Sequence, residues 1–242
     1  MTGRALCRAV LAIDAAGLTC SVAVSLGEKI LAQSQIDTLH GQAEALLPLV
    51  DRTMREAGLE PSTLEAVVVT VGPGSFTGIR VGLAAARGIA LATGTCLIGV
   101  TSFAAVAAGT TQSNLSDGRF LLVALESRRE DLYIQLFEPA GDPLAGRAVV
   151  MPSELGEEIQ ATVGAAPLLV AGDAALRAAA ALAQRHDTRI VERCVNGAVG
   201  TLRAGLRLWR LGRTEDAPRP LYLRRPDVTL SGDPGSPSRA RK

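Results

Sequence analysis

Hydrophobic and polar positions alternate along this chain in two patterns, one typical of strands and one typical of helices. Apolar or strictly alternating runs of five to nine residues predict strands, and apolar residues three or four positions apart predict helices. In the first 110 residues the pattern predicts, in order, strands 9–13, 20–26 and 29–36, helix 41–57, strand 67–71, helix 78–92, strand 96–100 and helix 102–108.

The same order of elements recurs in the second half of the chain. The pattern there predicts strands 120–125, 131–137 and 146–150, helix 152–161, strand 168–171, helix 174–185, strand 189–191 and helix 197–211. This is a repeat of topology rather than of sequence. It predicts an α/β protein of two similar lobes, each of βββαβαβα order, with a cleft between them.

The repeat also suggests where the lobes divide. We expect a first lobe over residues 1–110 and a second over 111–225, with the last helix, 197–211, able to pack back on the first lobe. An extended arm at 218–223 should lie along the body. Residues 226–242 are rich in Gly, Ser, Pro and basic residues and are predicted to form a disordered tail.

Composition narrows the class of protein. Hydrophobic residues make up 48% of the 242 residues and aromatic residues only 3%, so the core must be built from aliphatic side chains. The net charge of +1 provides no overall field for nucleic acid or anionic membrane. The four cysteines are scattered without a C-x-x-C pair, and no apolar run reaches the roughly 20 residues of a membrane span. These features predict a cytoplasmic protein without a membrane segment.

The most informative stretch is 71–82, a glycine-rich turn between a strand and a helix. Gly72, Gly74 and Gly78 allow close approach of a ligand or of another backbone, and Ser75 or Thr77 can cap the helix. The spacing matches neither G-x-G-x-x-G nor the P-loop, because no lysine follows Gly78. Two interpretations therefore stay open, a phosphate-binding loop and a tight structural turn.

The helix that follows carries a stripe of small residues. Gly78, Gly82, Ala86 and Ala90 recur every four positions, which places them on one face and permits close helix packing. A helix that is apolar on most sides must be buried on most sides. Either this stripe packs inside the protein, or it faces a partner chain.

Three segments carry a resemblance to a known family. The duplicated order resembles the sugar kinase, actin and Hsp70 fold, and segments 11–14, 72–82 and 220–224 look like those of bacterial TsaB, also called YeaZ. The resemblance implies a protein for threonylcarbamoyladenosine synthesis at position 37 of tRNA. TsaB there is the non-catalytic partner of the transferase TsaD, which shares its fold, and works with the ATPase TsaE.

The sequence shows whether the turns that bind a nucleotide in this fold have the residues that binding requires. The first-lobe turn keeps Asp14, Gly17 and Thr19, the candidates for cofactor binding. The second-lobe turn, 125–131, has no glycine, and the candidate adenosine turn, 171–174, has one glycine followed by an acid. N–H groups cannot easily wrap a phosphate there. We expect no cofactor on the isolated chain, and ATP or ADP only in a complex with partners.

A metal site is not predicted. TsaD carries a His-x-x-x-His pair after the strand that follows the central helix, whereas residues 98–104 here contain no histidine. The only histidines are His40 and His186, far apart in sequence. We therefore expect no metal and no catalytic residue.

The resemblance implies that the first-lobe helices pair with TsaD. The residues predicted for this partner interface are Leu46, Val50, Met54, Phe76, Gly78, Ile79, Gly82, Leu83, Ala86 and Ala90. TsaE and, through the complex, tRNA are the other implied partners, and a homodimer at rest stays open. The alternatives are an ATP-dependent transferase and a homodimeric nucleotide-binding module of the same fold.

Overall fold

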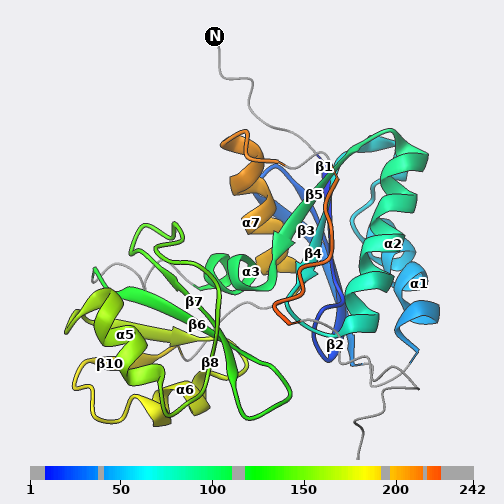
Figure 1. Cartoon of the computed structure of the whole chain (residues 1–242). Coiled ribbons are helices and arrows are strands. Elements are labelled where there is room, and N and C mark those ends of the chain that lie inside the picture. Colours follow the sequence, from blue (N-terminus) through cyan, green and yellow to red (C-terminus); the bar gives the residue numbers. More distant parts are fainter. Residues whose placement is uncertain (1–8, 38–40, 111–117, 192–196, 215–216, 225–242) are drawn as a thin grey trace, which may run out of the picture.

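The computed structural model describes residues 9–37, 41–110, 118–191, 197–214 and 217–224. In these residues the strands form two five-stranded sheets that lie side by side (Figure 1). The orders are β3-β2-β1-β4-β5 and β8-β7-β6-β9-β10, so each sheet has an antiparallel meander continued by parallel strands. The predicted α/β fold with a duplicated order is confirmed.

The elements of the two lobes follow the predicted order. The first lobe contains β1 (Ala9–Asp14), β2 (Thr19–Leu26), β3 (Lys29–Asp37), α1 (Gln42–Glu56), β4 (Leu64–Gly72), α2 (Phe76–Thr93), β5 (Cys96–Thr101) and α3 (Ser102–Gly109). The second contains β6 (Phe120–Glu126), β7 (Leu132–Phe137), β8 (Ala148–Val150), α5 (Leu155–Val163), β9 (Leu168–Ala171), α6 (Ala175–Ala181), β10 (Thr188–Ile190) and α7 (Ala198–Arg210).

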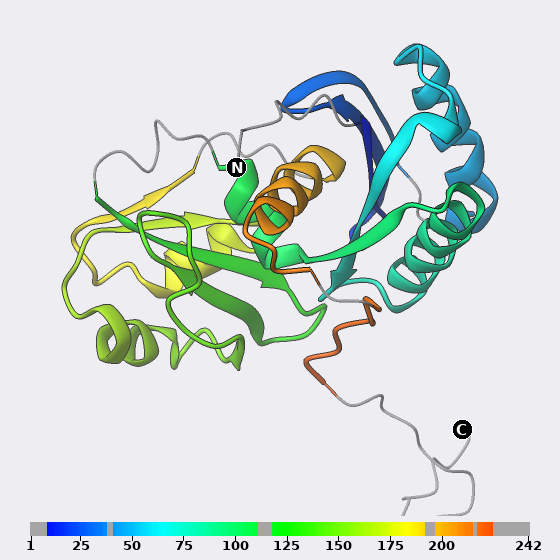
Figure 2. The same cartoon turned by 90° about the horizontal axis from the view of Figure 1, so that it is seen from above.

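The first sheet is buried on both faces because its central strands alternate between two cores. Leu11 and Ile13 of β1 belong to the core that α1 and α2 cover. Val10 and Ala12, on the opposite side of the same strand, pack with residues of α3 and α7. Figure 2 shows α1 and α2 on one side of this sheet and α7 on the other. A strand buried on both faces must be apolar, as β1 is from Ala9 to Ile13.

The last helix, α7, comes from the end of the second lobe's sequence but packs on the first sheet. Gly205 lies against Val68 of β4 so closely that a Cβ would overlap the valine side chain. The hydroxyls of Thr201 and Thr70 hydrogen-bond at 2.7 Å in the buried contact. The amide of Ala198 donates to Ser21 Oγ at 2.8 Å. The last helix therefore packs against β1, β2 and β4 of the first lobe, although it follows the second lobe in sequence.

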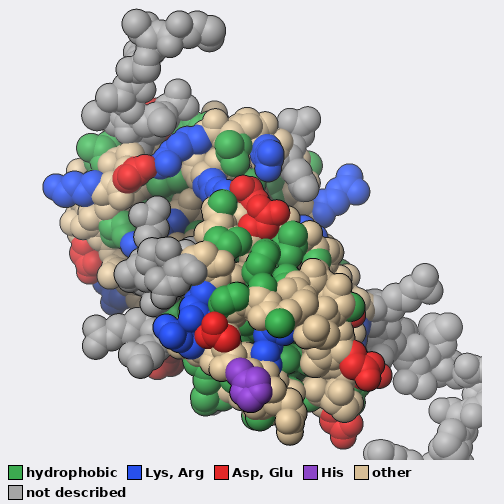
Figure 3. All heavy atoms as spheres, turned by 90° about the vertical axis from the view of Figure 1, so that its left-hand side faces the viewer, with side chains coloured by type: hydrophobic (Ala, Val, Ile, Leu, Met, Phe, Trp, Pro, Cys, Tyr) green, Lys and Arg blue, Asp and Glu red, His purple; other side chains and the backbone are tan. Residues whose placement is uncertain are grey.

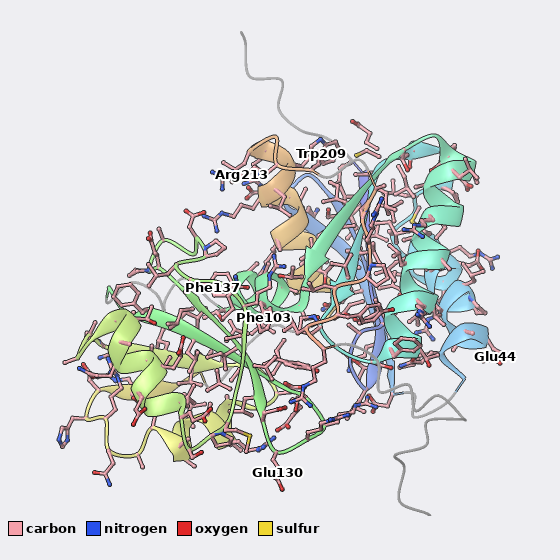
Figure 4. All side chains as sticks on the ribbon, viewed as in Figure 1. Glu44, Phe103, Glu130, Phe137, Trp209 and Arg213 are labelled. Atoms are coloured by element: carbon pink, nitrogen blue, oxygen red, sulfur yellow. The ribbon has the colours of Figure 1, made fainter. Side chains whose placement is uncertain are left out.

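The two lobes are joined by a buried hydrophobic contact. Phe103 and Val106 of α3 pack with Leu121 and Val123 of β6 and with Phe137 of β7. Figure 4 shows Phe103 and Phe137 where α3 meets the second sheet. This shared core packs α3 of the first lobe against the second sheet.

The surface has no dominant charge. On the face shown in Figure 3, acidic and basic side chains are intermixed rather than gathered into one large patch of a single sign. Within the described residues, no helix combines the length and the apolar character that a membrane span requires.

Candidate functional site

The glycines of the central turn are needed because the turn lies against the chain's own backbone. A Cβ at Gly74 would overlap the carbonyl oxygen of Ala16, and one at Gly78 would overlap that of Ala15. Ser75 N donates to Ala16 O at 2.7 Å, and its side chain caps α2 by accepting from Gly78 N at 3.2 Å. The structure therefore favours a tight structural turn, with Gly74 and Gly78 packed on the β1–β2 turn.

The three candidates for cofactor binding lie on this β1–β2 turn. Asp14 is half-buried at the end of β1, Gly17 is exposed, and Thr19 begins β2. Asp14 Oδ1 accepts from Ala16 N at 3.0 Å. Burial raises the pKa of the Asp14 carboxyl, and the hydrogen bonds from Ala16 and Thr70 lower it in part. Because Thr70 also contacts Thr201, a buried polar chain joins Asp14 to α7.

The second-lobe turn is closed by its own side chains. Ser127 Oγ donates to the carbonyl oxygen of Asp131 at 2.8 Å and contacts its carboxylate. The amide of Arg129 donates to Ser127 Oγ at 3.1 Å. Arg128 adopts a φ of 62°, a left-handed conformation that a glycine would take more readily. The missing glycine predicted a poor phosphate cradle, and the turn's hydrogen-bonding groups bind one another.

Two arginines from distant segments cover this turn. Arg177 of α6 forms an ion pair with Glu126 and donates to the carbonyl oxygen of Glu130 at 2.7 Å. Arg224, near the end of the described chain, forms an ion pair with the buried carboxylate of Asp131. Arg177 and Arg224 are therefore already paired with the protein's own acids. Figure 4 places Glu130 at the tip of the turn, below the body of the second lobe.

The turn after β9 is also tied to its neighbours. Gly172 has a φ of 111°, and a Cβ there would overlap the carbonyl oxygen of Ala124. Asp173 Oδ1 accepts from the amide of Glu126 at 2.9 Å. Desolvation raises the pKa of Asp173, while the hydrogen bond from Glu126 N lowers it in part. This acid links two turns that a nucleotide site would need to keep apart and open.

The predicted partner-interface residues divide into one exposed and nine buried positions. Phe76 is 47% exposed. The others are buried in the chain's own structure: Leu46, Val50, Met54, Gly78, Ile79, Gly82, Leu83, Ala86 and Ala90. The small-residue stripe therefore packs inward, where a Cβ on Gly82 would lie 3.5 Å from Ala15 Cβ. Of the two directions that the helix pattern left open, these contacts favour packing inside the protein, and the partner interface stays a prediction.

The opposite faces of the same helices remain accessible. Leu47 of α1 is 54% exposed and Leu91 of α2 is 86% exposed. Leu47 lies away from the buried face of α1, which is formed by Leu46, Leu49, Val50 and Met54. A partner on these helices would meet the outer residues, and that docking stays a prediction.

The C-terminal arm, residues 217–224, lies back on the first lobe as expected. The amide of Leu221 donates to Val71 O at 2.7 Å. Arg87 Nη2 donates to Pro218 O at 2.7 Å, and Pro218 fills the space beside Gly99. The arm thus runs beside the central turn, although almost 150 residues of sequence separate them.

The end of the arm reaches the second lobe. Leu223 packs against the core that joins the lobes, and Arg224 pairs with Asp131. The arm therefore contacts both lobes within eight residues. Sequence reasoning quoted Arg224 within a motif but did not place it at the turn, and no local pattern marked Arg177.

Truncation at two positions should distinguish the contribution of the arm to stability from that of the tail. Deleting the residues after Arg225 is expected to leave the melting temperature unchanged, because the arm's described contacts end at Arg224. Deleting those after Ala217 also removes two half-buried leucines, which should cost about 2 kcal/mol or more. That loss lowers the melting temperature by about 4–8 °C in a domain of this size. Thermal unfolding followed by circular dichroism measures both; a clear drop for the shorter deletion would show that the tail docks.

A separate hollow lies on the outer side of the second lobe. It has a volume of about 790 Å³ and lies between α5 and α6, with Glu157, Arg185, His186 and Asp187 among its lining residues. It shares no lining residue with the turns described above.

His40 lies outside the described residues, so the structure does not place it. Within the described chain, no three His, Cys, Asp or Glu side chains gather closely enough to hold a metal.

Two sheets of matching order, with helices on both faces of the first, define the actin and sugar-kinase class of fold. YeaZ from Pseudomonas aeruginosa superposes with a TM-score of 0.74 at 24% identity, covering 89% of this chain and 100% of that one. A ROK hexokinase from Thermus thermophilus superposes with a TM-score of 0.50 at 15% identity, covering 84% of this chain and 99% of that one. These likenesses show the fold.

Sequence comparison shows the family. Residues 38–166, just over half of the chain, match the family model "TsaD: tRNA N6-adenosine threonylcarbamoyltransferase", so the chain belongs to this family. The tRNA threonylcarbamoyladenosine biosynthesis protein TsaB of Escherichia coli is 31% identical over 124 residues, 51% of this chain and 52% of that protein. The TsaB of Haemophilus influenzae is 29% identical over 125 residues, 51% of each.

These matches confirm the resemblance to TsaB (YeaZ) proteins. The chain spans about half the length of the curated relatives it matches. The family and the fold are therefore shown, whereas the activity and the partners of those relatives are proposals for this chain.

Proposed function

We propose that this chain is a non-catalytic subunit of the machinery that makes threonylcarbamoyladenosine in tRNA, and that it pairs with TsaD. Membership of the family and the names of the E. coli and H. influenzae relatives support the pathway. In this proposal TsaD binds the substrates and carries out the transfer, TsaE joins the complex, and this chain stabilises the active arrangement.

The observation that carries the non-catalytic part is the state of the second-lobe turn. ATP hydrolysis in this fold needs backbone N–H groups free to hold phosphate. Here Ser127 and Asp131 close the turn, and Arg177 and Arg224 pair with its acids. A phosphate that bound Arg177 or Arg224 would have to displace the acid with which that arginine pairs. The geometry therefore supports a scaffold better than an ATPase.

The surface that we propose for TsaD is the outer face of α1 and α2. Three large apolar side chains on this face, Leu47, Phe76 and Leu91, are exposed to water. Exposed apolar surface of this kind can mark a site where a partner binds. A partner of the same fold could present its matching helices to form a four-helix contact. The buried stripe supports this surface indirectly, because it holds α2 tightly against β1 and β4.

The transfer reaction should depend on the partner. Incubated alone with threonylcarbamoyl-adenylate and tRNA, this chain should yield no modified nucleoside, because its second-lobe turn is closed. Addition of TsaD and TsaE should give product, measured by nuclease digestion and chromatography of the nucleosides. A reaction with TsaD and TsaE but without this chain is the matched control, and should be slower by a large factor.

Two results would contradict the proposal. Product from the isolated chain would make it a transferase in its own right. No complex with TsaD by mass measurement, together with saturable ATP binding to a homodimer, would favour the nucleotide-binding module instead.

A further inference from the structure

The exposed aromatic side chains of this protein are in contact with each other. The sequence contains seven aromatic residues, and all of them lie in the described part of the chain. Five are buried or half-buried, namely Phe103, Phe120, Tyr133, Phe137 and Trp209. The remaining two, Phe76 at 47% and Tyr222 at 40% exposure, have ring centroids 5.5 Å apart. One comes from the start of α2 and the other from the arm.

An arginine joins the two rings. The guanidinium carbon of Arg80 lies 3.5 Å from the centroid of the Phe76 ring, and Arg80 Nε donates to the hydroxyl of Tyr222 at 3.0 Å. In the described part of the chain no ion pair engages Arg80, and the first turn of α2 contains no acidic residue. Its outer nitrogens are thus available to an external carboxylate.

The three side chains continue the outer face of α2. Arg80, Ala84, Gly88 and Leu91 are all exposed and recur at three- and four-residue intervals, so they share one side of the helix. Tryptophan, tyrosine and arginine are enriched at the positions where partners bind most strongly. Here these residue types gather at one end of a face that ends in an exposed leucine at the other.

We infer that Phe76, Arg80 and Tyr222 form a composite partner-binding cluster, in which the arm supplies one of the three side chains, and that this cluster takes an apolar segment bearing a carboxylate. This inference rests on the proposed pairing with TsaD and names the part of the surface that binds it. A protein segment fits better than a nucleobase because the guanidinium already covers one face of the Phe76 ring, and because the face continues into aliphatic residues.

The cluster depends on the second lobe through the arm. Tyr222 lies two residues before Arg224, whose ion pair with Asp131 fixes the end of the arm on the second-lobe turn. Leu221, on the other side of Tyr222, is fixed to Val71 of the first lobe. Tyr222 is therefore held in place from both lobes. Arg224 is a positioning residue for the cluster, and a change at the second-lobe turn would alter the partner surface on the first lobe.

The isolated chain tests the positioning role without any partner. The sequence has only two tyrosines, Tyr133 and Tyr222, so a protein labelled with 3-fluorotyrosine gives two ¹⁹F resonances, assigned with Tyr222→Phe. Arg224→Gln should move the Tyr222 resonance toward that of an unfolded chain and leave Tyr133 in place. Arg219→Gln, an exposed arginine of the same arm without an ion pair in the described residues, is the control and should leave both unchanged. An unmoved Tyr222 resonance in Arg224→Gln would overturn the positioning role.

Affinity for TsaD tests the cluster itself. Tyr222→Leu should weaken binding about 10- to 30-fold, the size expected of a central aromatic contact. Arg224→Gln should weaken it only about two- to fivefold, because a partly exposed ion pair contributes little directly. If Arg224 acts by holding Tyr222, Arg224→Gln should have no further effect in a protein that already carries Tyr222→Leu.

The outcomes separate this inference from the proposed function. The cluster would be overturned if the losses of TsaD affinity from Tyr222→Leu and Arg224→Gln simply added in the double variant. It would also be overturned if Tyr222→Leu bound TsaD as tightly as the wild-type protein. A tRNA anticodon hairpin that moves the Tyr222 resonance when TsaD does not would reassign the cluster to RNA and overturn the inference. No binding of wild-type protein to TsaD would instead overturn the proposed function, with the fluorine result still standing. Arg80→Lys, which keeps the charge but loses the planar stack, replaces Tyr222→Leu if that variant melts early.

Discussion

Gly78→Ala is expected to destabilise the folded protein by about 3 kcal/mol or more, at the upper end of what overpacking usually costs. The added Cβ would overlap the carbonyl oxygen of Ala15, which is a backbone atom. No rotamer change can relieve this contact. Either α2 must move away from the first sheet, or the β1–β2 turn that carries Asp14 must shift. At 2–4 °C per kcal/mol the melting temperature should fall by about 6–12 °C.

The same helix offers a matched control in Gly88→Ala. Gly88 is exposed, and apart from its chain neighbours and the backbone of its own helix, no described atom lies within 4 Å of the position its Cβ would take. Alanine favours a helix over glycine by nearly 1 kcal/mol, so this variant should melt about 2–4 °C higher. Thermal unfolding should therefore show a lower melting temperature for Gly78→Ala and a higher one for Gly88→Ala, although the chemical change is the same. Equal effects of the two substitutions would show that Gly78 is not in close contact with Ala15.

The second large effect concerns the direction of the small-residue stripe. Gly82→Leu should lower stability by about 2 kcal/mol, the upper end of overpacking less the gain in helix propensity, because four further carbons must enter a core already lined by Ala15, Val69 and Ile13. Overpacking costs about 1–3 kcal/mol, and the better helix propensity of leucine offsets nearly 1 kcal/mol. Binding to TsaD should be nearly unchanged, since the side chain does not reach the outer face.

Gly82→Ala is the control at the same position. Its Cβ would lie 3.5 Å from Ala15 Cβ, an ordinary van der Waals distance, so alanine fits and should raise the melting temperature. Melting temperature and dissociation constant for TsaD should be measured on one preparation of each variant. An unchanged melting temperature in Gly82→Leu, combined with weak binding to TsaD, would place the stripe on the partner interface after all.

Local sequence was sufficient for the order of the elements and for the fold class. The apolar runs 9–13 and 67–71 predicted strands, which the structure contains as β1 and β4, and it divides β1 between two cores, with Leu11 on one side and Val10 on the other. Of the two residues predicted as possible caps of the central helix, Ser75 and Thr77, the structure uses Ser75. These features depend on residue type and spacing within a few positions, which a single sequence displays.

The nature of the sites was predictable only in part. The lack of glycine in the second-lobe turn was visible, and the turn is indeed closed. Which residues cover it was not visible, because Arg177 and Arg224 lie about 50 and 90 positions further along the chain. A charged residue in a sequence does not show its partner, since ion pairs form between residues that the fold brings together.

By itself, then, the sequence determined the strand and helix order, the duplicated lobes and the family resemblance, because each follows from local spacing or a continuous motif. Only the tertiary structure decided that Gly78 and Gly82 face β1, that Leu47 and Leu91 face outward, and that Tyr222 meets Phe76. A helical stripe shows that one face must be buried but not what covers it. Contacts between residues 63 or more positions apart, such as Ala15 with Gly78, depend on how the layers pack.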